Sequence, residues 1–129
     1  MASEGLHEPL ELIQPDTVDR HRANTSLREE LEAVDWYDQR VDATGDAELA
    51  AVLAHNRDEE KEHAAMTLEW LRRHDPVLDG HLRTYLFTTE PVTEIEAEAE
   101  GAGGTTTPQP ATTTPGSGSL DIGSLKGVD

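Results

Sequence analysis

The chain has 129 residues, enough for one modest domain, and a formal net charge of −17. Residues 1–90 contribute −12 of that charge, and so acidic a fold repels nucleic acid and anionic membranes. Because the chain has no cysteine, any metal must be held by carboxylate and imidazole groups. No apolar run reaches membrane-spanning length and no signal-peptide pattern opens the chain, so we expect a cytoplasmic protein.

Two long helices are predicted in the first half of the chain. Residues 1–15 are expected to be an irregular N-terminal segment, because two prolines interrupt them. The first long helix should then run from an N-cap at Asp16 or Thr17 to about Ala43. Residues 44–46 contain a glycine and break the helical pattern.

The second long helix is predicted from Ala47 to about His74, with Asp46 as its N-cap. The Asp-Pro pair at 75–76 then predicts the start of a shorter third helix that ends near Tyr85. Two long helices of similar length with so short a connection form an antiparallel hairpin. Since no strand pattern competes, the predicted fold class is all-α.

The C-terminal third differs in composition. No aromatic residue follows Phe87, and residues 101–118 are almost wholly Gly, Thr, Pro and Ser, which cannot bury enough apolar surface to fold. We therefore predict a helical domain over 16–91, a disordered linker over 92–118 and a separate segment over 119–129. A fold of roughly ninety residues is close to the lower limit for a self-sufficient core, which favours oligomerisation.

Each long helix carries an apolar stripe that is expected to face the other helix. The stripes contain Leu27, Leu31, Val34 and Val41 on the first helix, and Leu49, Val52, Leu53, Trp70 and Leu71 on the second.

Three potential metal ligands fall on or beside these stripes. Glu60 and His63 lie within the stripe of the second helix, and Glu30 lies at the edge of the first. Glu30 precedes Gly45 by fifteen residues and Glu60 follows it by fifteen, so the hairpin is expected to bring both to the same height. Unpaired carboxylates in an apolar seam are costly, and a bound metal would remove that cost.

A di-iron centre in a four-helix bundle takes a Glu from each of two helices and a Glu-x-x-His from each of the other two. This chain supplies one Glu, Glu30, and one Glu-x-x-His, at Glu60 and His63. A second copy should therefore complete the site and the bundle by dimerisation. Iron is the expected metal, two ions per subunit pair, and Ca²⁺ or Zn²⁺ can occupy the same ligands.

Two alternatives use some of the same residues. Glu60 could instead form a buried ion pair with His63 or with Arg57. A zinc site built from His55, Glu59 and His63 is also conceivable, although it would lie at the edge of the stripe.

Two features of the first helix have ordinary explanations beside functional ones. Tyr37 lies on the side of Glu30, about two turns away, and is either a partly buried core residue or a neighbour of the metal ligands. Trp36 faces the opposite way, close to Glu29 and Glu32. By itself such an acidic cluster indicates only a charged surface.

Four runs of sequence together closely resemble the encapsulated ferritins, over about residues 5–91. The runs are LEAVDWY (31–37), NRDEEKEH (56–63), MTLEWLR (66–72) and RTYLF (83–87). The resemblance implies half-ferritins in which two chains build one ferroxidase centre that oxidises Fe(II) to Fe(III). It also implies a ring of ten subunits inside an encapsulin shell, which stores the iron mineral.

The resemblance also implies roles for individual residues. It makes Glu30, Glu60 and His63 the metal ligands, Tyr37 a catalytic neighbour, and Glu29, Glu32 and Trp36 the site through which metal enters.

The C-terminal run SLDIGSLKG (119–127) resembles the targeting peptides that dock cargo on the inner wall of encapsulin shells. Leu120, Ile122 and Leu125 would be its apolar anchors, and Gly123 would permit a close backbone approach. The expected partner is an encapsulin shell protein, and the expected location is a nanocompartment in the prokaryotic cytoplasm. The alternative function is a non-catalytic, metal-stabilised helical cargo adaptor.

Overall fold

The structure is a computed structural model that describes residues 5–103, without the side chains of residues 102 and 103. All regular elements within this range are helices, which confirms the predicted all-α class. None of these helices is long and apolar enough to cross a membrane. The chain divides into two compact units, one that ends at His74 and one that begins at Asp75.

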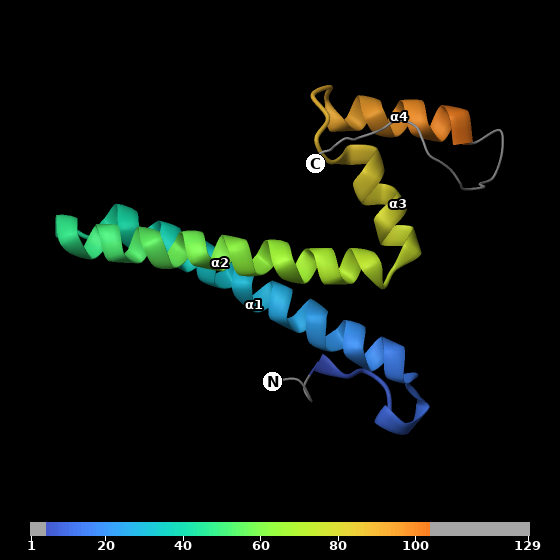
Figure 1. The fold of residues 1–129 in the computed structure, drawn as a ribbon, viewed down its shortest axis with the longest axis horizontal. Coiled ribbons are helices and arrows are strands. Elements are labelled where there is room, and N and C mark those ends of the chain that lie inside the picture. Colours follow the sequence, from blue (N-terminus) through green and yellow to red (C-terminus); the bar gives the residue numbers. More distant parts are fainter. Residues whose placement is uncertain (1–4, 104–129) are drawn as a thin grey trace. The chain divides into compact units, whose positions relative to one another are not determined.

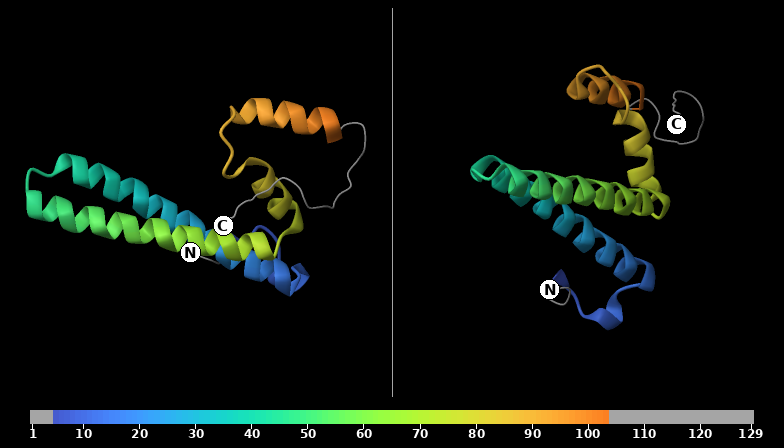
Figure 2. Two further views of the ribbon diagram at one scale, coloured as in Figure 1. Left: turned by 45° about the horizontal axis from the view of Figure 1, so that its top comes forward. Right: turned by 60° about the vertical axis from the view of Figure 1, so that its left-hand side comes forward.

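The first unit is an antiparallel helical hairpin, as predicted. Helix α1 (Pro15–Ala43) and helix α2 (Ala47–Arg73) lie side by side next to their connection (Figure 1). Away from the connection they diverge, which is clear in Figure 1 and in the right-hand view of Figure 2. A short 3-10 helix, η2 (Leu10–Leu12), precedes α1 within the segment expected to be irregular.

One of the two predicted helix starts in this unit is confirmed. The side chain of Asp46 accepts a hydrogen bond of 2.9 Å from a backbone N–H in the first turn of α2, as an N-cap does. The predicted N-cap of α1 at Asp16 or Thr17 is wrong, because α1 begins at Pro15 with Gln14 before it. Proline suits the first helical position, where its missing N–H would have had no partner.

Very little of the hairpin is buried within one chain. Among the described residues only Ala64 and Leu71 are buried, with 8% and 3% of their surface exposed. Three residues of the predicted stripes, Leu31, Leu49 and Val52, remain 54%, 46% and 51% exposed. One hairpin therefore lacks the core that a stable domain of this size needs.

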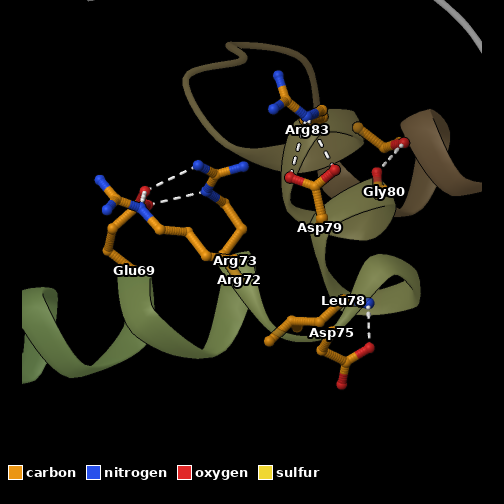
Figure 3. A network of polar contacts seen from close by, with 9 residues as sticks. Glu69, Arg72, Arg73, Asp75, Leu78, Asp79, Gly80 and Arg83 are labelled. Carbon is orange, nitrogen blue, oxygen red and sulfur yellow. Dashed lines mark hydrogen bonds and ion pairs between the residues drawn. The ribbon is translucent and has the colours of Figure 1, made fainter.

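The last turns of α2 carry a charged cluster. The carboxylate of Glu69 accepts hydrogen bonds of 2.8 and 2.7 Å from Arg72 and one of 2.6 Å from Arg73 (Figure 3). These hydrogen bonds, that of Arg72 first, lower the pKa of Glu69 from 4.5 to about 2. Both arginines also lie near the negative end of the helix dipole, where cations stabilise the helix.

The second unit contains α3 (Pro76–Tyr85) and α4 (Val92–Gly103). Asp75 caps α3 by accepting a hydrogen bond of 3.0 Å from the N–H of Leu78, as predicted (Figure 3). Helix α4 corrects the expectation of a disordered linker from residue 92. Its sequence is rich in Glu and Ala, which both favour helix. The rest of that linker, 104–118, and the segment 119–129 lie outside the described residues.

Candidate metal centre

The Glu-x-x-His pair lies on one side of α2. The Oε1 atom of Glu60 is 3.6 Å from Nδ1 of His63, and the two side chains are 29% and 43% exposed. The spacing of three residues places them on the same face, one turn apart. A carboxylate oxygen and an imidazole nitrogen so placed are suitable ligands for one metal ion of the first transition row.

Glu30 on α1 is held by a hydroxyl group of α2. The Oγ1 atom of Thr67 lies 3.1 Å from Oε1 of Glu30 and 3.0 Å from the backbone oxygen of His63. Glu30, Thr67 and His63 are all partly buried. Within the described residues, the second carboxylate oxygen of Glu30 has no hydrogen bond or ion pair.

The contacts across the hairpin do not match the expectation that Glu30 and Glu60 lie at one height. Asp38 pairs with Arg57 at 3.0 Å, and Glu30 contacts Thr67. In both contacts the α2 residue lies farther from the connection, counted along the chain, than the α1 residue does. Side chains lean toward the N-terminus of their own helix, which is away from the connection in α1 and toward it in α2. The carboxylate of Glu30 therefore contacts α2 about two turns beyond Glu60.

The expected convergence of three ligands is not found in a single chain. Among residues 5–103, no three His, Asp or Glu side chains lie close enough to hold one metal ion. One chain instead presents the pair Glu60 and His63 and, separately, Glu30. One glutamate and one Glu-x-x-His are half of the ligand set that a di-iron centre in a four-helix bundle takes.

The structure does not form the predicted alternative ion pair between Glu60 and Arg57. Arg57 contacts Asp58 at 3.1 Å and, across the hairpin, Asp38 at 3.0 Å. These hydrogen bonds, that of Asp58 first, raise the pKa of Arg57. The other form of this alternative, a pair of Glu60 with His63, is present as an ionic contact of 3.6 Å, but it is partly exposed rather than buried and too long for a good hydrogen bond.

The alternative zinc site is also incomplete. His55 lies 3.5 Å from Glu59, and both side chains are exposed to solvent. His63 contacts Glu60 rather than this pair. The part of the chain that the structure describes therefore does not bring His55, Glu59 and His63 together.

Arg40 was not among the predicted site residues, yet it connects two of them. Its guanidinium carbon lies 5.9 Å from the ring centre of the exposed Trp36 and 5.6 Å from that of the partly buried Tyr37. These are cation–π distances. The sequence contained the signal, because Arg40 follows both aromatic residues by one helical turn. Glu29 and Glu32 are exposed on α1, as predicted.

The sequence matches the EncFtn-like family over residues 5–89. The chain belongs to this family. The encapsulated ferritin-like protein of Rhodospirillum rubrum is 64% identical over 127 residues, which cover 98% of this chain and 91% of that protein. The resemblance to encapsulated ferritins is thereby confirmed.

Two further proteins are similar to this EncFtn-like chain. The encapsulin nanocompartment cargo protein EncC of Myxococcus xanthus is 38% identical over 58 residues, 45% of each chain. The crystal structure of protein ne0167 from Nitrosomonas europaea matches the fold of this chain with a TM-score of 0.66, and the two sequences are 62% identical. The match covers 68% of this chain and 97% of the ne0167 chain.

The predicted targeting residues Leu120, Ile122, Gly123 and Leu125 lie outside the described residues.

Proposed function

We propose that this EncFtn-like protein is a ferroxidase, in which Glu30, Glu60 and His63 from two copies bind two iron ions. The iron is the substrate, and each Fe(II) loses one electron to O₂ to become Fe(III). The observation that carries the proposal is the pairing of Glu60 with His63 on α2, beside a glutamate of α1 that is held by Thr67. This is half of a di-iron carboxylate ligand set.

The chemistry of the ligands favours iron. Carboxylate oxygens are hard ligands that suit Fe(III) better than Fe(II), so the ligand set stabilises the oxidised product. Two of the three proposed ligands are carboxylates, and two copies would bring four of them together. Zn²⁺ and Ca²⁺ can bind such groups but cannot be oxidised, so they would act as inhibitors.

Packing independently supports the pairing of two copies. The hairpin buries only Ala64 and Leu71 among the described residues and leaves Leu31 and Val52 about half exposed. A second hairpin would cover these side chains and complete a four-helix bundle. We further propose that such dimers form the ring of ten subunits that the family resemblance implies.

The names of the relatives support a location for this activity. One relative is an encapsulated ferritin-like protein and another is an encapsulin nanocompartment cargo protein. We propose that this chain is likewise cargo of an encapsulin shell, that residues 119–129 dock it there, and that the shell stores the oxidised iron. The proposed location is a nanocompartment in the prokaryotic cytoplasm.

Substitution of the ligands tests the ferroxidase assignment. Glu30→Ala, Glu60→Ala and His63→Ala should each slow oxygen-dependent Fe(II) oxidation by at least about tenfold, since even outer partners of metal ligands matter that much. Formation of Fe(III) can be followed by its absorbance. Glu69→Ala is the control and should leave the rate unchanged, because Glu69 is bound by two arginines outside the ligand set.

Near-normal oxidation by Glu60→Ala would contradict the assignment of the site. If the wild-type protein bound Fe(II) without oxidising it in the presence of O₂, the non-catalytic adaptor would be the better description.

Removal of residues 119–129 tests the shell assignment separately. The shortened protein should oxidise iron at the wild-type rate but should not load into co-expressed encapsulin shells. Attachment of these residues to an unrelated soluble protein should confer loading, which can be measured by electrophoresis of purified shells. Loading of the shortened protein would show that the targeting signal lies elsewhere.

A further inference from the structure

The hydroxyl group of Thr67 has two acceptors in range but only one hydrogen to donate. One acceptor is the carboxylate oxygen Oε1 of Glu30, and the other is the backbone oxygen of His63, four residues earlier in α2. A hydrogen bond to an ionised carboxylate is about twice as strong as one to a neutral carbonyl. The single hydrogen is therefore shared between the two acceptors as a three-centre bond, in which the carboxylate of Glu30 is the stronger acceptor.

The contact with His63 explains why the hydroxyl group is available at that position. A threonine inside a helix commonly directs its oxygen toward the carbonyl one turn back, and this choice fixes its side-chain rotamer. In Thr67 that rotamer also places the oxygen within reach of α1. The backbone of the turn that carries His63 thus orients the group that holds Glu30.

This arrangement makes the two oxygens of Glu30 unequal. Oε1 is occupied by the hydroxyl of Thr67, whereas Oε2 has no hydrogen-bond or ionic partner among the described residues. A carboxylate with one oxygen already bonded is restricted in both position and rotation. Such hydrogen bonds to ligating carboxylates orient the ligand before the metal arrives.

We propose that Thr67 is a positioning residue of the metal centre. By donating to Oε1 of Glu30, it holds the α1 ligand in register with the turn of α2 that carries His63, and it leaves Oε2 for the metal. This inference rests on the proposed function, because it takes Glu30 and His63 as metal ligands.

The hairpin provides a matched control for a purely structural role. Asp38 and Arg57 form another polar contact between α1 and α2, at a similar distance of 3.0 Å. Neither residue belongs to the proposed ligand set. Asp38→Asn weakens this contact between the helices without removing a partner of Glu30, so it separates loss of hairpin stability from loss of ligand positioning.

Titration of the full-length protein with Co²⁺ tests the proposal without depending on oxidation. The visible absorption of bound Co²⁺ reports both affinity and ligand geometry. Thr67→Val has the same shape but no hydroxyl, and it should bind Co²⁺ about tenfold more weakly with an altered spectrum. Thr67→Ser retains the donor and should restore both, and Asp38→Asn should resemble the wild type.

The possible outcomes distinguish this proposal from the function on which it rests. Wild-type affinity and spectrum in Thr67→Val, together with loss of binding in Glu30→Ala, would overturn the role of Thr67 alone. Wild-type binding in Glu30→Ala would overturn the metal site itself. If circular dichroism shows that Thr67→Val does not fold, Thr67→Ala replaces it, since alanine also lacks the hydroxyl and favours helix more.

Discussion

The carboxylate of Glu69, whose pKa is lowered to about 2 by its arginine partners, lies outside the proposed ligand set. Arg72 donates to both of its oxygens and Arg73 to one of them, as Figure 3 shows. A carboxylate so engaged is a poor metal ligand, because a metal ion would have to displace both guanidinium groups. Local charge therefore separates Glu69 from Glu30 and Glu60, although all three are glutamates of the same hairpin.

The lowered pKa predicts a pH dependence of stability. Because the pKa of Glu69 is about 2 in the folded chain and 4.5 in the unfolded one, ionised Glu69 stabilises the fold above pH 4.5. This contribution should be lost as the pH falls from 4.5 toward 2. In urea unfolding followed by circular dichroism, Glu69→Gln should show a weaker pH dependence in this range than the wild type.

The two proteins should differ by no more than about 1 kcal/mol in the part of the unfolding free energy that depends on pH, because Glu69 is partly exposed and solvent screens its attraction to the arginines. Glu62→Gln is the matched control on α2, and it should retain the wild-type pH dependence. If the unfolding free energy changes equally with pH in Glu69→Gln and in the wild type, the arginine contacts do not stabilise the fold.

Part of the candidate site could be predicted from residue type and helical spacing alone. The spacing of Glu60 and His63 places them within one turn, and the structure brings them together. The relation of Glu30 to Glu60 could not be predicted by counting from Gly45. Counting gives the heights of the Cα atoms, whereas the lean of each side chain decides where its carboxylate lies. The contact between Glu30 and Thr67 depends on that lean.

At the scale of the helices, the start of α2 depends on one side chain. Asp46 accepts a hydrogen bond from the N–H of Leu49, so Asp46→Ala should lower the free energy of unfolding by about 1 kcal/mol. Asp46→Asn should retain most of the stability, since the amide oxygen can accept the same hydrogen bond. Urea unfolding of the three proteins measures the difference. An equal loss in both variants would indicate that the charge of Asp46, rather than the cap, is responsible.

The sequence predicted helix starts best where a capping side chain precedes a clear helical pattern, as at Asp46 and Asp75. The sequence misplaces the start of α1, because Asp16 and Thr17 are good capping residues and a proline just before them also fits a break in the chain. The prediction also misses α4, because the Gly- and Thr-rich composition begins only at residue 101 and the Glu and Ala residues before it favour helix. At the start of α1, the capping preference of Asp16 and Thr17 competes with the preference of proline for the first helical position. In α4, the helix propensity of Glu and Ala competes with the composition of the residues that follow.

At the scale of the whole molecule, metal binding and assembly should be coupled. A paired site would bring together four carboxylates, two from Glu30 and two from Glu60, and without metal their repulsion opposes association. Divalent cations would neutralise this charge, and they should bind the assembled form more tightly because only that form offers the complete ligand set. Metal should therefore stabilise the assembly by mass action.

Sedimentation of metal-free and Fe(II)-loaded protein under anaerobic conditions tests this coupling. The metal-free protein should dissociate into smaller species on dilution, and Fe(II) should restore the larger ones at the same protein concentration. Ca²⁺ or Zn²⁺ should act similarly through the carboxylates. Glu60→Ala is the control and should respond weakly to metal. An identical size distribution with every metal and at every dilution would show that apolar contacts alone hold the assembly.

The short connection between α1 and α2 has a consequence for the order of events after synthesis. Helices of this kind form within about a microsecond, and the hairpin needs only a small loop to close. Association of two hairpins is a second-order step that takes milliseconds to minutes and depends on concentration. A new chain should therefore sample its hairpin almost at once, but the hairpin lacks a core of its own and should become stable only when it meets a partner. If the proposed iron oxidation requires the paired site, the delay before it begins is set by how often two chains meet, and this delay should shorten as the protein accumulates.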